Sequence, residues 1–360
     1  MPVPLFASNH DRYNATLRER LGQVIDSGRY ILGPEVEAFE REFADYLGAR
    51  HCVGVANGTD AITLALRALG VEPGDDVVLP SFTFYATAEA TANAGANPVF
   101  CDVDPDTFCV TRETVERAMT PRTKAIVAVH LFGNVAPVPD LLDLGVPVLE
   151  DSAQAAGATL GGANAGALGH AATFSFFPSK NLFCLGDGGA VTTNDDEVAA
   201  RVRRLRFHGS EDKQSFVDVG YNSRLDELQA AALRVLLPEL DGWNASRRAV
   251  AAAYEENGLG EHVALPRPVD GADPVYHLYV VRSERAEQLR AALEAAGIGA
   301  RAYYRLPVHL QAAMARWGGS KLELPGTEVA ARENLALPMG SNLAPEAVGE
   351  VVAACRAALV

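Results

Sequence analysis

Short apolar, β-branched runs alternate with helix-period segments through the first two thirds of the chain, and this alternation restricts the fold more than any other feature. It predicts an α/β fold whose central sheet is mainly parallel and covered by helices on both faces. Such sheets bind ligands where the carboxyl ends of their strands meet. The strands are expected at residues 52–56, 76–79, 98–102, 124–130, 146–150, 172–176 and 189–193, and the helices between them at 58–69, 84–94, 112–119 and 196–206.

The length of the chain predicts a second, smaller domain. Its 360 residues exceed the ~250–300 at which a single hydrophobic core usually stops growing. The sheet, its helices and an N-terminal arm are assigned to a large domain of residues 1–245, and residues 246–360 to a small α+β domain. Further helices are expected at 13–25, 34–46, 225–240, 247–256, 287–296 and 344–359, with a strand at 276–281.

The charge balance restricts the partners. The chain carries 31 basic and 46 acidic residues, a net charge of −15 at pH 7, and no run of Lys or Arg. Binding to nucleic acid requires a concentrated basic face, so no nucleic-acid partner is expected. No stretch approaches ~18 uninterrupted apolar residues, and the first residues lack a basic region followed by an apolar run. These features predict a cytoplasmic protein without a membrane partner.

The motifs exclude several kinds of chemistry. The five cysteines are scattered, without the paired spacing of a zinc site or a disulfide framework, so we expect buried, reduced thiols and no metal site. The His-Glu-x-x-His, G-x-S-x-G, P-loop and G-x-G-x-x-G motifs are missing from the sequence. Serine hydrolysis and hydride transfer are therefore disfavoured.

Lysine is informative because it is rare. The chain has four lysines, namely Lys124, Lys180, Lys213 and Lys321. Lys180 alone lies in an aromatic context, after Phe174, Phe176 and Phe177 and before a glycine-rich stretch. Burying an ammonium without a partner is costly, and condensation with an aldehyde cofactor removes that cost. Lys180 is therefore a candidate for such a bond; the alternative is a lysine that extends its ammonium to solvent from a strand end.

A cofactor such as pyridoxal phosphate needs a carboxylate for its ring nitrogen, a cup for its phosphate and a flat partner for its ring. Asp151 ends a buried strand and suits the first role, although it can also cap the next turn. The amides that open a helix at Gly58, with the Thr59 hydroxyl, suit a phosphate. Phe84 follows another strand and is the candidate stacking ring, or else a core side chain.

Six motifs, in order along the chain, match one family. They are GRYILGP at 28–34, ANGTDA at 56–61, EDSAQ at 150–154, SFFPSK at 175–180, GDGGA at 186–190 and GYNSRL at 220–225. From about residue 5 to its end the chain resembles the DegT/DnrJ/StrS family of sugar aminotransferases. The resemblance implies a fold type I pyridoxal phosphate (PLP) enzyme, similar to aspartate aminotransferase, that acts on nucleotide-linked keto sugars.

The resemblance assigns roles around the cofactor ring. Lys180 matches the lysine that forms the internal aldimine and then carries protons between the substrate and the cofactor. Asp151 matches the partner of the pyridine nitrogen, Gln154 the side chain near the phenolic oxygen, and Phe84 the stacking aromatic residue.

The resemblance also assigns the phosphate site. Thr59, the backbone of Asp60, and Ser175 match phosphate ligands within the chain. Asn222 matches a phosphate ligand from the neighbouring subunit, which implies a homodimer with shared active sites. The alternative role of Asn222 is to cap the helix that begins near Leu225.

The implied reaction is a two-step amino transfer. An amino donor, glutamate by resemblance, converts the pyridoxal form of the cofactor to pyridoxamine phosphate (PMP), which aminates a nucleotide-diphosphate keto sugar. Arg224 and Tyr304 are candidate donors to the anionic substrate. Where many members carry His-Tyr before a proline, this chain has Tyr303 and Tyr304 before Pro307.

Three alternatives to this reading remain. One is a PLP-dependent sugar dehydratase or lyase; family members that dehydrate sugars have a histidine at the position of Lys180, and the cysteines lie in no activated-nucleophile motif. Another is a PLP-binding regulator without turnover. The third concerns regiochemistry: relatives that aminate position 4 of the sugar carry an asparagine where this chain has Glu89. The resemblance therefore favours a 3-keto sugar over a 4-keto sugar.

Overall fold

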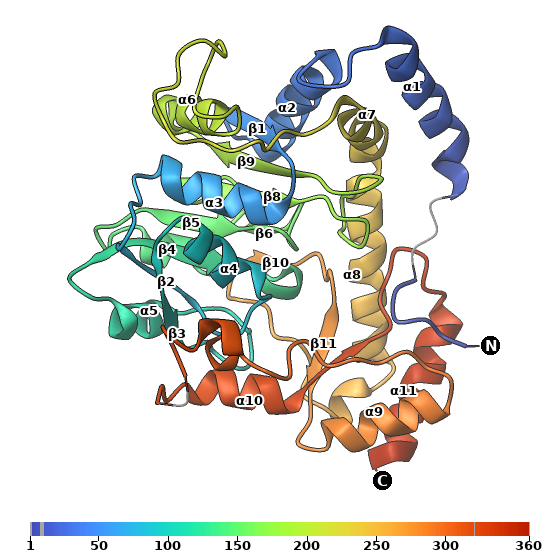
Figure 1. Cartoon of the computed structure of the whole chain (residues 1–360). Helices are drawn as coiled ribbons and strands as arrows, with labels where there is room; N and C mark the ends of the chain where they lie inside the picture. Colours follow the sequence, from blue (N-terminus) through green and yellow to red (C-terminus); the bar gives the residue numbers. More distant parts are fainter. Residues whose placement is uncertain (1, 8–10, 320, 360) are drawn as a thin grey trace.

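The computed structural model describes residues 2–7, 11–319 and 321–359 and has a seven-stranded sheet at its centre (Figure 1). The strand order is β1-β9-β8-β5-β4-β2-β3, and β9 is antiparallel to both of its neighbours while the others run parallel to one another. The prediction of a mainly parallel α/β sheet is confirmed. The strands are β1 His51–Val55, β2 Asp76–Pro80, β3 Asn97–Cys101, β4 Thr123–Val129, β5 Val148–Asp151, β8 Ala171–Ser175 and β9 Gly189–Thr193.

Helices cover the sheet, and the strands are accordingly apolar along their length. Every residue of β2 and of β9 is buried, as expected for strands with both faces covered. α3 packs on β8 and β9, and α6 packs on β1 and β9. The helices that follow individual strands are α3 Gly58–Ala68, α4 Ala86–Asn93, α5 Arg112–Ala118 and α6 Asp196–Leu205.

The N-terminal helices α1 (Asn14–Ser27) and α2 (Pro34–Leu47) pack against α7 (Glu227–Leu236). An aromatic cluster joins α2 to the sheet: the Phe43 ring lies 4.9 Å from that of Phe174 and 5.5 Å from that of Phe176, both edge to face. Phe174 and Phe176, which precede Lys180, are thus core side chains that anchor β8 and the turn after it, whereas Phe177 is exposed.

The longest helix, α8 (Leu240–Glu256), begins earlier than expected. The sequence predicts helices at 225–240 and 247–256, whereas the structure has α7, a 3-10 turn at Leu237–Glu239, and then α8. Pro238 lies at the start of that turn, where its missing N–H costs little, so the chain stays helical. The boundary between residues 245 and 246 falls inside α8, and the division into two domains stays a prediction.

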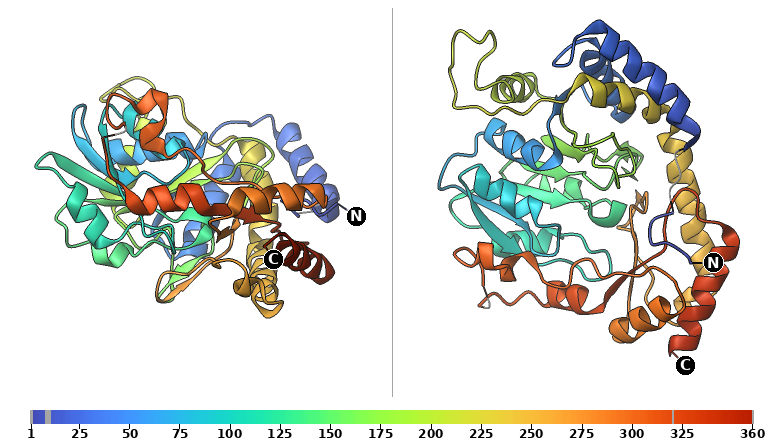
Figure 2. Two further views of the ribbon diagram at one scale, coloured as in Figure 1. Left: turned by 90° about the horizontal axis from the view of Figure 1, so that it is seen from below. Right: turned by 45° about the vertical axis from the view of Figure 1, so that its right-hand side comes forward.

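The C-terminal third builds a separate core on α8. β11 (Tyr279–Arg282) and β12 (Asn334–Leu337) form an antiparallel pair, and α9 (Ala286–Ala295), α10 (Pro325–Glu333) and α11 (Pro345–Leu359) surround it. Val250 and Tyr254 of α8 pack into this core with Leu289 and Val351. Figure 2 shows both chain ends on the side of the molecule where α8 and α11 lie.

Smaller elements complete the chain. A three-stranded sheet contains β6 (Thr159–Leu160), β7 (Ala163–Asn164) and β10 (Ala272–Asp273). All five cysteines are buried, free thiols, as expected. Among the helices of residues 2–7, 11–319 and 321–359, none combines the length and the hydrophobicity needed to cross a membrane.

Candidate active site

A cavity of about 420 Å³ lies at the carboxyl edge of the sheet. It opens beyond the last residues of three strands, Val129 of β4, Asp151 of β5 and Ser175 of β8. The start of α3 and the residues just before α4 form further walls, and His277 and Leu278 of the C-terminal third close one side. The expectation that a ligand site lies at this edge agrees with this geometry.

The cavity brings together most of the predicted site residues. Its lining includes Gly58, Thr59, Phe84, Asp151, Gln154, Ser175, Lys180 and Tyr304. Asp60 lies behind the lining, and its amide donates to Asn57 Oδ1 (2.8 Å) as part of the α3 N-cap. Asn222 and Arg224 lie outside the cavity of their own chain, with the Arg224 guanidinium donating to Asn222 Oδ1. The roles of these residues stay predictions.

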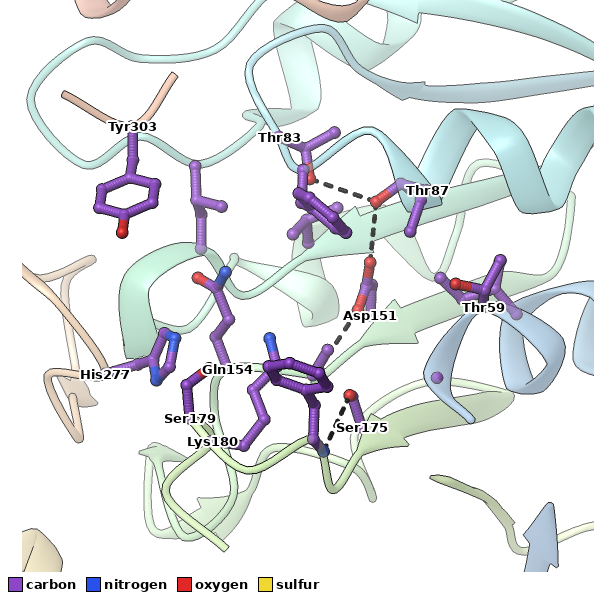
Figure 3. A pocket seen from close by; sticks show the side chains of 18 of the residues that line it. Thr59, Thr83, Thr87, Asp151, Gln154, Ser175, Ser179, Lys180, His277 and Tyr303 are labelled. Carbon is purple, nitrogen blue, oxygen red and sulfur yellow. Dashed lines mark hydrogen bonds between the residues drawn. The ribbon is translucent and has the colours of Figure 1, made fainter. Parts of the chain in front are cut away.

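Asp151 is a buried carboxylate held on both oxygens. The Thr87 hydroxyl donates to Oδ2 (2.9 Å) and the Ala153 amide to Oδ1 (3.3 Å). Burial raises the pKa of Asp151 above that of an ordinary aspartate, while these two bonds and the charges of Lys180 and His130 oppose the rise. Figure 3 shows the Thr83–Thr87–Asp151 chain of hydrogen bonds at the cavity wall.

Lys180 lies in the turn that follows β8. Its amide donates to the Phe177 carbonyl (2.8 Å), and its side chain rises into the space between Gln154 and Asp151 (Figure 3). Burial lowers the pKa of Lys180 to about 8, although the Asp151 charge acts in the opposite direction. About a tenth of the amine is therefore neutral at pH 7, far more than for an ordinary lysine, and the neutral form is the nucleophile.

The lowered pKa predicts how cofactor capture by the apoenzyme depends on pH. Only the neutral amine of Lys180 attacks an aldehyde, so the rate of covalent capture of pyridoxal phosphate should rise as pH rises and level off above about 8. Stopped-flow absorbance across pH 6–10, roughly the range that brackets this pKa, measures the midpoint. A midpoint near that of an ordinary lysine would contradict the expectation.

The backbone fixes the orientation of Gln154. Its Oε1 accepts a hydrogen bond from the Phe132 amide (2.6 Å). The carboxamide nitrogen is thereby the atom that can donate into the cavity. A donor at this place suits an anionic oxygen on a ring held between Lys180 and Asp151.

The start of α3 forms the other end of the cavity. Asn57 caps the helix, so the amides of Gly58 and Thr59 belong to the first turn, whose N–H groups have no partner within the helix. Thr59 and Ser175 lie on the same side of the cavity (Figure 3). A Cβ on Gly58 would stand 2.7 Å from Ser175 Cβ, so only glycine lets the helix start this close to β8. The arrangement suits a phosphate.

Replacing Gly58 tests this cradle. In Gly58→Ala the new methyl group displaces Ser175 or the helix start, and we expect the affinity for pyridoxal phosphate to fall roughly tenfold through lost phosphate contacts. Fluorescence titration of the apoenzyme measures the dissociation constant. Gly22→Ala is the matched control, because a Cβ there meets no atom within 4 Å and lies inside α1. Equal affinities in the two variants would contradict the role of Gly58.

The structure adds residues to which the sequence assigned no role in the site. Thr87 supports Asp151, and His277, Ser179 and Tyr303 line the side of the cavity opposite Thr59 and Ser175 (Figure 3). Thr87 lies three residues after Phe84 in the predicted helix at 84–94, so the sequence could have placed both side chains on the same face of that helix. His277 gave only a weak signal, a lone histidine in an apolar run. In the described part of the chain, no cluster of His, Cys, Asp and Glu is suited to a metal ion.

Comparison with known proteins decides the family. The model of the DegT/DnrJ/EryC1/StrS aminotransferase family matches residues 12–356. The chain belongs to this family. Membership confirms the predicted class of enzyme, a PLP-dependent aminotransferase, and agrees with the predicted fold.

Relatives within the family are similar over nearly their whole length. A dTDP-3-amino-3,4,6-trideoxy-alpha-D-glucose transaminase of Streptomyces venezuelae is 45% identical, over 96% of this chain and 95% of its own. A UDP-N-acetyl-3-dehydro-alpha-D-glucosamine 3-aminotransferase of Acidithiobacillus ferrooxidans is 42% identical, over 94% and 92%. A protein of Geobacillus stearothermophilus named as a pleiotropic regulatory protein is 45% identical, over 96% and 95%.

A solved family structure confirms the fold. The crystal structure of S. venezuelae DesV in complex with a ketimine intermediate superposes with a TM-score of 0.95 at 44% identity, covering 99% of this chain and 98% of DesV. The predicted fold type I architecture, with a mainly parallel sheet, is confirmed by this similarity.

Proposed function

We propose that this aminotransferase transfers an amino group to the 3-keto position of a nucleotide-linked sugar, with pyridoxal phosphate as cofactor and an amino acid as donor. The observation that carries the proposal is the place of Lys180, which enters the cavity between Gln154 and the Asp151 carboxylate, with Thr59 at the start of α3 on the far side of Asp151 (Figure 3). When bound, the cofactor supplies an aldehyde for the amine and a ring that stores an electron pair.

Different residues of the chain contact the phosphate, the ring nitrogen, the aldehyde carbon and the face of the cofactor ring. The first turn of α3 and Ser175 bind the phosphate, and Asp151 keeps the ring nitrogen protonated through a charge-assisted bond. Lys180 Nζ holds the cofactor, and once displaced it takes a proton from the donor carbon and returns it at the cofactor's aldehyde carbon. The Phe84 ring stands at the cavity wall, 6.0 Å from that of Tyr304, and suits stacking on the cofactor.

The names of relatives support position 3. Both transaminases described above carry position 3 in their names, and the helical position that we associate with amination at position 4 is occupied by Glu89. The reaction run backwards separates the two positions: paired 3-amino and 4-amino nucleotide sugars are mixed with the pyridoxal form, and formation of the pyridoxamine form is followed. Preference for the 4-amino sugar would overturn the assignment.

We propose that the amino donor is glutamate. Mixing the protein with glutamate tests this proposal and also tests the alternative that the protein is a regulator without turnover. One relative is named as a regulatory protein, but the cavity of this chain contains a lysine of lowered pKa, a buried carboxylate and a phosphate cradle. This arrangement favours turnover. Glutamate should convert the protein to the pyridoxamine form with release of 2-oxoglutarate; binding of the cofactor without conversion by any donor would support the regulator.

We also propose a cytoplasmic homodimer whose subunits share active sites. Asn222 is exposed beside Arg224, away from the cavity of its own chain. Exposed apolar side chains lie on neighbouring segments. Among them are Ile31, whose backbone forms an isolated β-bridge with Asp226, and Phe216, whose backbone forms one with Ser210. A second copy of the chain that covers these side chains would receive Asn222 and Arg224 at its own cavity.

Mixed dimers test the shared site. Lys180→Ala and Asn222→Ala chains are each expected to be inactive as homodimers. In a heterodimer both lesions fall in one site and leave the other intact, so random mixing should restore about one quarter of wild-type activity. Native mass spectrometry confirms that heterodimers form. Heterodimers without recovered activity would refute the shared site.

A further inference from the structure

Tyr303 and Tyr304 line the cavity and belong to a stretch of chain that crosses from the C-terminal core to the large sheet. At the first end of this stretch, the Tyr303 amide donates to Asn334 Oδ1 on β12 (2.6 Å). The backbone of residues 304–307, all within the described part of the chain, makes no hydrogen bond to a residue outside 303–311. The position of the tyrosines therefore depends on how the two ends are anchored.

The second anchor lies at the carboxyl end of β2 and includes a buried bond between side chains. The Val308 amide donates to the Ser81 carbonyl (3.0 Å), and the His309 amide donates to Ser81 Oγ (3.3 Å). Ser81 is fully buried and His309 is 2% exposed, with Ser81 Oγ 2.5 Å from His309 Nδ1. Among the described residues Ser81 Oγ has no further partner, so it donates its own proton to Nδ1, which is the acceptor.

Ser81 is itself fixed to the sheet. Its amide donates to the carbonyl of Cys101, at the end of the neighbouring strand β3 (3.0 Å). The rings of Phe82 and Phe84, which follow Ser81, lie 6.3 Å and 6.0 Å from that of Tyr304. Contacts between rings tolerate small displacements, whereas a buried hydrogen bond is satisfied in a narrow range of geometry. The side-chain bond is thus the part of the anchor that fixes the stretch most closely.

We infer that the bond between Ser81 and His309 makes His309 a positioning residue for the sugar substrate. The bond holds Tyr303 and Tyr304 at the cavity wall, where they contact the nucleotide sugar. The inference rests on the proposed function, because it takes Tyr304 as a substrate ligand. His309 is buried outside the cavity lining and touches neither substrate nor cofactor. Loss of the bond should therefore weaken sugar binding without removing a group that transfers protons.

Two substitutions of His309 separate the hydrogen bond from the packing. Asparagine has an oxygen at the place of Nδ1 and keeps an acceptor for the Ser81 hydroxyl, whereas leucine fills the same space without an acceptor. Ser81→Ala removes the bond from the other side. Thr327→Val is the matched control, because it also removes a buried hydroxyl, but one without a hydrogen-bond partner in the described part of the chain.

The two half-reactions give separate readouts. The pyridoxal form is mixed with glutamate, or with dTDP-3-amino-3,4,6-trideoxy-alpha-D-glucose, the amino sugar in the name of the S. venezuelae transaminase. Ser81→Ala and His309→Leu should raise the half-saturating concentration of the amino sugar by about tenfold. Their rates with glutamate should stay within about twofold of wild type. His309→Asn and Thr327→Val should match the wild type with both substrates. A purely structural role predicts instead that both half-reactions slow together, because they share Lys180 and the cofactor.

Fluorine spectra report the position of Tyr304 without turnover. The chain contains ten tyrosines, so protein labelled with 3-fluorotyrosine gives few signals, and that of Tyr304 is assigned by its loss in Tyr304→Phe. We expect one narrow signal in the wild type, His309→Asn and Thr327→Val, and a shifted or broadened one in Ser81→Ala and His309→Leu. Thermal unfolding of each variant checks that it is folded.

The outcomes separate the inference from the proposed function. A Tyr304 signal unchanged in both Ser81→Ala and His309→Leu would overturn the inference, as would equal slowing of the two half-reactions. If the wild type reacts with neither the amino sugar nor any donor, the proposed function fails, while the spectra still decide whether His309 positions Tyr304. If the wild type reacts and His309→Asn is as impaired as His309→Leu, the inference alone fails.

Discussion

Lys180→Ala should abolish amino transfer, with a fall in turnover of at least about 10⁴-fold, because one substitution removes both the covalent attachment and the proton carrier. The variant should also lack the visible absorption of cofactor bound to lysine. The remaining ligands, Asp151 and the phosphate cradle at Gly58, are untouched, so we expect the variant still to bind pyridoxal phosphate reversibly. Steady-state assays and absorption spectra measure the two effects.

Lys124→Ala is the matched control, because this lysine is exposed at the start of β4, away from the cavity. It should behave as wild type in both measurements. Turnover in Lys180→Ala comparable to that of the control would remove the lysine from the mechanism.

Asp151→Asn should have the second-largest effect. The substitution replaces a charge by a neutral group of the same shape, so the charge-assisted bond to the ring nitrogen is lost. We expect the half-reaction with glutamate to slow by on the order of tenfold to a hundredfold, since hydrogen bonds to charged groups contribute about 1.5–3 kcal/mol. Asp143→Asn, on the surface, is the control. Similar rates for the two variants would contradict the role of Asp151.

Thr87→Val tests how the reaction rate depends on pH through the pKa of Asp151. The Thr87 hydroxyl lowers the pKa of Asp151 against the effect of burial. Without it the pKa rises further, so the carboxylate is protonated at a higher pH as the solution is acidified. The acid limb of the rate profile should therefore move to higher pH. A profile that coincides with that of the wild type would show that Thr87 does not support Asp151.

Sequence patterns predicted the sheet well because its strands are continuous apolar runs flanked by turns. All seven predicted strands are present in the structure, with ends that differ by at most two residues. The two-residue strands β6, β7 and β10 were not predicted, because such short segments have no periodicity to detect. The expected strand at 276–281 is shorter, starting at Tyr279, because the preceding residues turn to face the cavity.

The site was predictable where its residues are local. Lys180, Asp151 and the start of α3 each follow a strand, and motifs mark them. His277 and its partners were beyond such reasoning, because they come from three distant segments: Asn181 after β8, Asn244 on α8 and His277 before β11. A network of this kind depends on tertiary packing that periodicity does not encode.

The continuity of α8 limits how this protein can be recombined with its relatives. One face of the helix contributes Asn244 and Arg247 to the supports of the cavity, and its later turns contribute Val250 and Tyr254 to the C-terminal core. A chimaera joined between residues 245 and 246 would take Asn244 from one parent and Arg247 from the other. Exchanges of the C-terminal third between family members should therefore place the junction outside Leu240–Glu256, so that the helix is inherited whole.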